Sequence, residues 1–195
     1  MRSYLNIFIF ILLVSSCSED EEITYGISEP EIDQNIGSSD NYVKDILKEK
    51  SYDLNKFFVG AALNTNQLNT YVENIFLNEF NYSTVENSAK QTIVHPEPSV
   101  WKWDRLDSYL DFIEKNNITS RIHGPVGPQS SKWAKNDSRT GEELMENMTE
   151  YMTELSKKLN DINAVKWMDV VNETITTSGQ WHGEREGDDK WENPW

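Results

Sequence analysis

The 195-residue chain is poor in the residues that form covalent cross-links and metal centres. Cys17 is its only cysteine, so an internal disulfide is impossible. Its three histidines, His95, His123 and His182, are scattered along the sequence. Protein metal sites need several such ligands close together. We therefore expect no bound metal, no other cofactor and no disulfide-stabilised core.

Basic residues are also scarce. The chain has 18 Lys and Arg against 33 Asp and Glu, which gives a formal net charge of −15. Nucleic-acid-binding proteins neutralise phosphates with clustered Lys and Arg, and the sequence contains no basic patch. We therefore expect no nucleic-acid partner, whereas a neutral polysaccharide is compatible with this charge.

Long apolar runs are missing as well. The run Ile7–Val14 is shorter than the roughly 20 residues of a membrane span. Because it follows Arg2 and precedes small residues, it is typical of a secretory signal. Val14-Ser15-Ser16-Cys17 resembles a bacterial lipobox, so we expect removal of residues 1–16 and lipidation of Cys17. The protein would then be a lipoprotein of the outer membrane or cell surface. A free or buried thiol is the alternative.

The segment after Cys17 is acidic, with seven acids and no base between Ser18 and Asp33. Such a stretch cannot bury enough apolar surface to fold. We expect residues 17–42 to form a disordered tether and residues 43–195 to form the folded domain.

Two longer segments show helical periodicity, and a short helix is expected at Val43–Lys50. In Asp104–Asn116 the inward side chains would be Leu106, Tyr109, Leu110 and Ile113. In Glu142–Asn160 a single core-facing stripe would contain Leu144, Met148, Met152, Leu155 and Leu159. Strand-like segments alternate with these helices, so the pattern predicts an α/β fold with a parallel sheet.

The run Trp167–Glu173 (WMDVVNE) reads as a buried strand that ends in Asn172 and Glu173. Catalytic groups of (β/α) barrels lie at the carboxyl ends of the strands. A glutamate there can donate a proton to a glycosidic oxygen, and the amide can bind a sugar hydroxyl. An exposed glutamate at the start of a loop remains the alternative. For Asp169 we expect a structural hydrogen bond to a neighbouring strand.

Several segments occur in the order found in one family, and together they resemble glycoside hydrolase family 10, the retaining endo-xylanases. The matching segments are FFVGAALNTNQL (Phe57–Leu68), NEFNYSTVENSAK (Asn78–Lys90), IVHPEPSVWKWDRLD (Ile93–Asp107), TSRIHG (Thr119–Gly124) and WMDVVNE.

The resemblance implies a (β/α)8 TIM barrel of which this chain holds about the first four βα units. A complete barrel takes roughly 250 residues, more than Phe57–Trp195 provides. The resemblance places the catalytic nucleophile on a later strand, so we expect the chain to lack it and to need self-association or a partner chain to complete the barrel.

The resemblance also implies site residues. Glu173 would be the acid/base. Glu86, Asn87 and Lys90 would bind the sugar on the non-reducing side of the cut, His123 the sugar next to the scissile bond, and Asn172 a sugar hydroxyl. Taken alone, the segment Glu86–Lys90 reads as an ordinary polar helix start.

After His123 the chain departs from the family pattern Thr-Leu-Val-Trp-His, because it continues with Gly124–Pro128 (GPVGP). The aromatic residue and the second histidine are absent, which predicts a reshaped site. Among the seven tryptophans, Trp181, Trp191 and Trp195 could stack on pyranose rings. For Trp101, Trp103 and Trp167 we expect packing roles.

Two functions from different classes follow. The first is an endo-1,4-β-xylanase-like hydrolase that acts on xylan or a related xylose-containing polysaccharide. The alternative is a surface glycan-binding lipoprotein that retains sugar contacts without catalysis.

Overall fold

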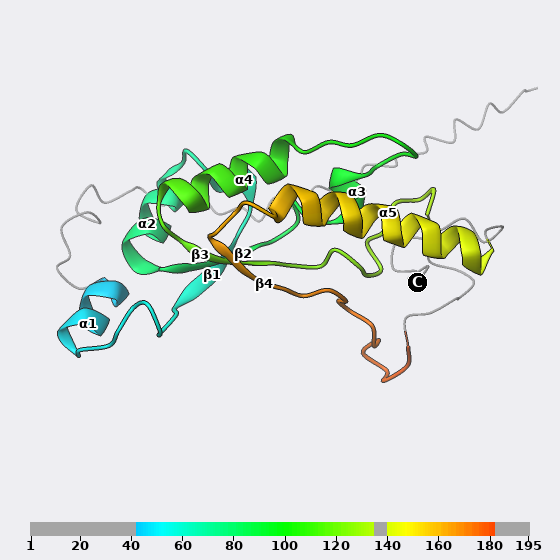
Figure 1. Ribbon diagram of the computed structural model, residues 1–195. Coiled ribbons are helices and arrows are strands. Elements are labelled where there is room, and N and C mark those ends of the chain that lie inside the picture. The colour runs from blue at the N-terminus through cyan, green and yellow to red at the C-terminus, as the bar shows by residue number, and fades with distance from the viewer. Residues whose placement is uncertain (1–41, 135–139, 182–195) are drawn as a thin grey trace, which may run out of the picture. The chain divides into compact units, whose positions relative to one another are not determined.

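A four-stranded parallel sheet forms the centre of the computed structural model, which describes residues 42–134 and 140–181. The strands are β1 (Gly60–Leu63), β2 (Tyr82–Val85), β3 (Thr119–Ile122) and β4 (Val165–Met168). They lie side by side in sequence order. The structure therefore confirms an α/β fold with four parallel strands, each beside its neighbour in sequence, as in a barrel wall (Figure 1).

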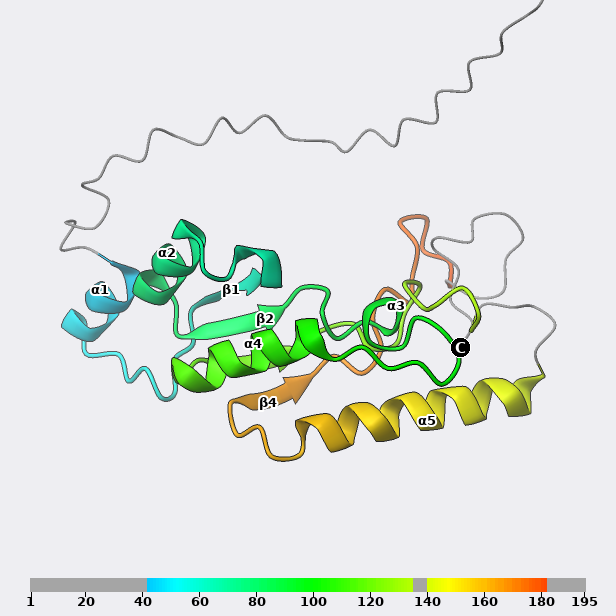
Figure 2. The same cartoon turned by 90° about the horizontal axis from the view of Figure 1, so that it is seen from above.

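One helix precedes the strands, and the other helical segments connect them. They are α1 (Val43–Glu49), the 3₁₀ turn η2 (Thr65–Gln67), α2 (Tyr71–Glu79), α3 (Gln91–Val94), α4 (Asp104–Lys115) and α5 (Gly141–Leu159). The helices expected near residues 43, 104 and 142 are present, whereas α2 was not expected. Helix α3 begins directly after Glu86–Lys90, the segment whose alternative interpretation was a polar helix start. Figures 1 and 2 show α4 and α5 on the same side of the sheet. In the described part of the chain, no helix is long and apolar enough to cross a membrane.

The core lies between this helical layer and one face of the sheet. Leu63, Val85 and Ile122 point into it from the strands. All four side chains expected to face inward from α4 are buried, namely Leu106, Tyr109, Leu110 and Ile113. The helical period in this segment therefore identified the correct face.

Helix α5 is rotated from the expected orientation. Its buried residues are Asn147, Tyr151 and Leu155. The Tyr151 hydroxyl donates a 2.6 Å hydrogen bond to the carbonyl of Ala89, and the Asn147 side chain accepts one of 3.0 Å from the side chain of Gln91. Leu155 alone of the expected stripe is fully buried, because these polar contacts fix which face meets the core. Its other members, Leu144, Met148, Met152 and Leu159, are half-buried.

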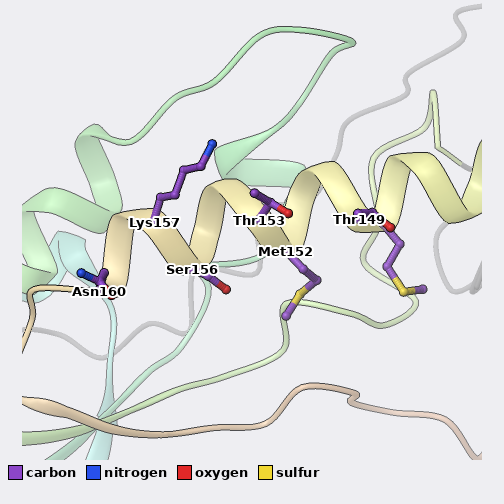
Figure 3. Close-up of a pocket in the computed structure, with 7 residues that line it drawn as sticks. Thr149, Met152, Thr153, Ser156, Lys157 and Asn160 are labelled. Atoms are coloured by element: carbon purple, nitrogen blue, oxygen red, sulfur yellow. The ribbon is translucent and has the colours of Figure 1, made fainter.

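Because part of its apolar side is only half-buried, α5 borders an open groove along its length. It is lined by Met148, Thr149, Met152, Thr153, Ser156, Lys157 and Asn160. Figure 3 shows Met152 and Thr149 on the helix that lines it. Within the described ranges, no helix fills this groove, whereas the opposite side of α5 packs on the core.

The other face of the sheet is uncovered in the described part of the chain. Phe58, Tyr82 and Trp167 form an aromatic cluster there, with ring centroids 5.5 to 6.0 Å apart. The expectation of a buried strand at Trp167–Glu173 is wrong, because Trp167 is 45% exposed and both Val170 and Val171 are at least half exposed. Strand β4 ends at Met168 and lies at the edge of the described sheet, so its side chains have no second neighbouring strand among the described residues.

The pairing of β3 with β4 contains an irregularity. Ser120 pairs with Val165, but the next residue, Arg121, pairs with Trp167. Lys166 is therefore an extra residue in β4, as in a β-bulge. Because of it, Val165 and Met168 both pack against the core although they are three residues apart.

Candidate active site

Polar side chains converge where the strands end, because the carboxyl ends of parallel strands lie along one edge of the sheet. A cavity of about 470 Å³ opens there. The larger side chains that line it are Tyr82, Thr84, Glu86, Asn87, Lys90, His123 and Gln129. Four residues expected to bind sugar, Glu86, Asn87, Lys90 and His123, therefore meet around one space.

Lys90 is the buried cation of this site. The residue is 7% exposed, and Nζ donates a 2.9 Å hydrogen bond to the side chain of Asn87. Burial lowers the pKa of Lys90, and the negative charges of Glu173 and Glu86 act in the opposite direction. Glu173 is thus within electrostatic reach of the cavity, although it does not line the cavity.

Asn172 and Glu173 lie in the loop that follows β4. The backbone N–H of Asn172 donates a 2.8 Å hydrogen bond to the carbonyl of Val126, and Val171 pairs with Val126. This contact continues the parallel pairing beyond the two strands. Glu173 is exposed and has a φ of 53°. Left-handed backbone is uncommon for residues other than glycine, and such strained positions concentrate at functional sites.

The loop after β3 owes its close packing to glycine. A Cβ on Gly127 would lie 2.9 Å from the backbone oxygen of Asn172. Gly124 has a φ of 66°, and a Cβ there would lie 3.2 Å from Cε of Lys90 and 3.6 Å from Nδ2 of Asn172. The segment that departs from the family pattern therefore brings Lys90 and the Asn172 loop together. Sequence reasoning noticed the departure and missed this contact.

Asp169 forms the structural contact expected of it. One carboxylate oxygen lies 3.0 Å from Nδ1 of His123, and the other lies 3.4 Å from a guanidinium nitrogen of Arg121. The acid therefore links the segment after β4 to the neighbouring strand β3.

His95 has an environment that the sequence did not predict. Its ring is fully buried, stacks on Trp101 at 3.9 Å and meets Trp133 edge-on at 4.7 Å. Neither ring nitrogen has a hydrogen-bond partner among the described residues, and burial lowers the pKa of His95, with Glu150 acting in the opposite direction. The only sequence signal is the proximity of His95 to the tryptophans of the segment that follows.

The tryptophans divide into two groups. Trp101 and Trp103 stack on each other at 5.2 Å and pack against the core, so their expected packing role is confirmed. Trp181 is 71% exposed in the loop after Glu173. Trp191, Trp195 and the proposed lipidation site Cys17 lie outside the described residues. In residues 42–134 and 140–181, no group of three His, Cys, Asp or Glu side chains could hold a metal ion.

Comparison with known proteins gives the same family along most of the chain. The model of glycosyl hydrolase family 10 matches residues 48–193. A beta-1,4-xylanase of Dictyoglomus thermophilum is 32% identical over 122 residues, which cover 62% of this chain and 33% of that protein. Endo-1,4-beta-xylanase A of Caldicellulosiruptor saccharolyticus is 31% identical over 124 residues, which cover 61% of this chain and 36% of that protein.

Solved structures agree with the fold. Xylanase XynB of Paenibacillus barcinonensis has a TM-score of 0.57 at 27% identity and covers 63% of this chain and 38% of its own. Xylanase 10B of Thermotoga petrophila, solved with xylobiose, has a TM-score of 0.63 at 24% identity. The match covers 76% of this chain and 44% of that one. The chain thus spans about a third of the length of the curated relatives it matches. With the family model matched over residues 48–193, the chain belongs to glycosyl hydrolase family 10.

Proposed function

We propose that this chain forms the proton-donor side of a retaining endo-1,4-β-xylanase that acts on xylan or a related xylose-containing polysaccharide. The observation that carries the proposal is the meeting of Glu86, Asn87, Lys90 and His123 around one cavity, beside the loop that carries Glu173. The family membership of the chain supports the reaction class.

In this proposal Glu173 is the acid/base. Its exposed position leaves it open to a substrate in the cavity mouth, and Lys90 lies within electrostatic reach. Glu173 first protonates the leaving glycosidic oxygen and later takes a proton from the attacking water. A second carboxylate about 5 to 5.5 Å away serves as nucleophile. We place this nucleophile on a part of the barrel outside the described residues.

The remaining residues bind the sugar. Sugar hydroxyls both donate and accept hydrogen bonds. Lys90 supplies donors, Glu86 supplies acceptors, and the amides of Asn87 and Asn172 supply both. His123 adds a ring nitrogen on the β3 side.

Completion of the barrel is part of the proposal. Strand β4 has no second neighbour among the described residues, one sheet face is uncovered, and the α5 groove is open (Figure 3). These three features lie where a further strand and helix would pack. We propose that this unit comes from another part of the protein, from a partner chain or from a second copy.

The test of catalysis compares Glu173→Ala with the parent sequence in the complete barrel. General acid–base catalysis contributes about 10²- to 10⁴-fold, so xylan turnover should fall by that order. Aryl xylosides with good leaving groups need little protonation and should lose much less in the bond-cleaving step. Equal turnover of unactivated xylan by variant and parent would contradict the role of Glu173.

A binding test separates the alternative function. Lys90→Met should weaken xylo-oligosaccharide binding, whereas Lys56→Met should not, because the side chain of Lys56 is 85% exposed and does not line the cavity. Xylo-oligosaccharide binding without turnover by the complete barrel would favour a non-catalytic glycan-binding protein. Unchanged binding in Lys90→Met would contradict the proposed sugar site.

We also propose that Cys17 is lipidated and that residues 1–16 are removed, on the basis of the lipobox-like Val14–Cys17. Export and anchoring would place the site outside the cell, where polysaccharides are found. Cys17→Ser should release the protein from membranes in a fractionation experiment. Membrane retention of that variant with unchanged processing would refute the anchor.

A further inference from the structure

Three side chains beside the cavity form a linked set: Arg121, His123 and Asp169. Arg121 lies in β3, and His123 follows it by two residues, so both side chains leave the chain on the same side. One carboxylate oxygen of Asp169 is hydrogen-bonded to Nδ1 of His123 at 3.0 Å, and the other forms an ion pair with Nη1 of Arg121 at 3.4 Å. The carboxylate therefore has one oxygen for each partner.

We infer that Asp169 is a positioning residue that fixes the tautomer of His123. An ionised carboxylate only accepts hydrogen bonds, so the neutral ring must carry its proton on Nδ1. Nε2 then keeps its lone pair. No described residue forms a hydrogen bond with Nε2, and His123 lines the cavity.

The ring thus presents an acceptor to a ligand that donates, such as a hydroxyl group. Histidine tautomers are commonly set by the hydrogen bond of the other ring nitrogen. That the ligand is a sugar hydroxyl rests on the proposed function. The tautomer itself does not, because it follows from Asp169 alone.

Arg121 should fix the orientation of the new side-chain amide in Asp169→Asn. A guanidinium has donors and no acceptor, so the amide oxygen of the new side chain should face Arg121. The amide nitrogen then faces His123 and donates to Nδ1. The ring proton must move to Nε2, and the cavity receives a donor in place of an acceptor.

The tautomer can be read from ring ¹⁵N shifts in the full chain at about pH 8.5, above the usual histidine pKa of about 6.5. The parent should show His123 protonated at Nδ1, and Asp169→Asn should show it protonated at Nε2. Adding Arg121→Met to Asp169→Asn should give a mixture, because the amide can then rotate. His123→Gln assigns the signals, and unchanged His95 signals show that the fold is kept.

A chemical measurement also works on dilute or self-associated protein. Diethyl pyrocarbonate reacts with an accessible ring nitrogen that carries no proton, and peptide mass spectrometry locates the product. His123 should react several-fold more slowly in Asp169→Asn than in the parent. Asp161→Asn is the matched control, because Asp161 is exposed and hydrogen-bonded to Asn160. In this variant His123 should react with diethyl pyrocarbonate at the rate found for the parent.

Two results would overturn the inference. One is an Nε2-protonated His123 in the parent, and the other is a tautomer and reaction rate that do not change in Asp169→Asn. Failure of the proposed function would appear differently, as an Nδ1-protonated His123 in a protein that binds no xylo-oligosaccharide.

Discussion

The imidazole of His95 lies between two indole rings, with both nitrogens buried and without a partner among the described residues. A protonated ring would carry a charge into this apolar site, and its solvation by water would be lost. The stacking geometry therefore suits the neutral form, in agreement with the lowered pKa of His95.

This burial predicts a pH dependence of stability. The pKa of His95 is lowered in the folded chain, so below the usual histidine pKa of about 6.5 the unfolded chain binds a proton that the folded chain does not. The contribution is fully present above that pH and is lost as the pH falls. His95→Phe keeps the stacking and removes the titration. Chemical denaturation between about pH 7.5 and 5 should therefore show a smaller decline for the variant than for the parent. Equal slopes would contradict the prediction.

Individual site residues could be predicted from the sequence only where they belong to a recognisable motif. Glu86, Asn87, Lys90 and His123 came from the resemblance to a family, and the structure brings them around one cavity. His95 could not be assigned, because its environment depends on Trp133, which is distant in sequence. Contacts of that kind leave no local periodicity to detect.

The loop Gly124–Pro128 joins three elements of the site. It follows β3, contacts Lys90 from the segment after β2, and pairs through Val126 with the segment after β4. The hydroxyl of Ser130 donates a 2.7 Å hydrogen bond to the carbonyl of Gly127 and holds the loop from its other side. Its shape therefore determines how far Asn172 and Glu173 lie from the cavity.

Gly127→Ala should test this loop. Its Cβ would meet the backbone of Asn172 at 2.9 Å, so the loop or its neighbour must move, at a cost of about 1 to 3 kcal/mol in unfolding free energy. Gly141→Ala is the matched control, because nothing lies within 4 Å of its Cβ and the helical backbone accepts alanine. It should be neutral or stabilise by about 0.4 to 1 kcal/mol. Equal denaturation midpoints for both variants would contradict the packing argument.

Secondary structure was predictable where one period controlled a segment. Helix α4 matched in its buried face and, to within one residue, in its bounds, because its apolar residues follow a single helical period. Helix α5 matched in bounds but not in face, because Tyr151 and Asn147 form buried polar contacts with distant residues. A strand was expected at Trp167–Glu173, but β4 is Val165–Met168 and overlaps that range only at its start. The expected burial was also wrong, since burial depends on neighbouring strands.

At the scale of the whole molecule, the sheet has one covered face and one open face in the described residues. The aromatic cluster of Phe58, Tyr82 and Trp167 lies on the open face, and β4 presents a free edge. Free strand edges and contiguous apolar patches favour association with other chains.

The 195-residue chain should therefore self-associate. Light scattering after size exclusion should show a mass that rises with protein concentration above that of the monomer. Trp167→Lys should lower this mass, because it places a charge on the open face. Met145→Lys should not, although Met145 is 66% exposed, because it lies on α5 outside the groove residues.

Circular dichroism must show that both variants keep the helical content of the parent. A parent chain that stays monomeric at all concentrations and melts in one sharp transition would refute the prediction.

Lys166 is accommodated in β4 as an extra residue without changing how the residues after it pair with β3. The extra residue opposite Ser120 and Arg121 puts Trp167 opposite Arg121, on the open face. Asp169, two residues later, reaches Arg121 and His123 on that face. Deletion of Lys166 would make Val165 and Trp167 consecutive, and strict alternation would then keep Trp167, Met168 and Asp169 on the faces that they now occupy. A homologous chain that lacks this one residue should therefore keep Asp169 on the face of His123 and lose only the local bend and twist that a bulge adds to β4.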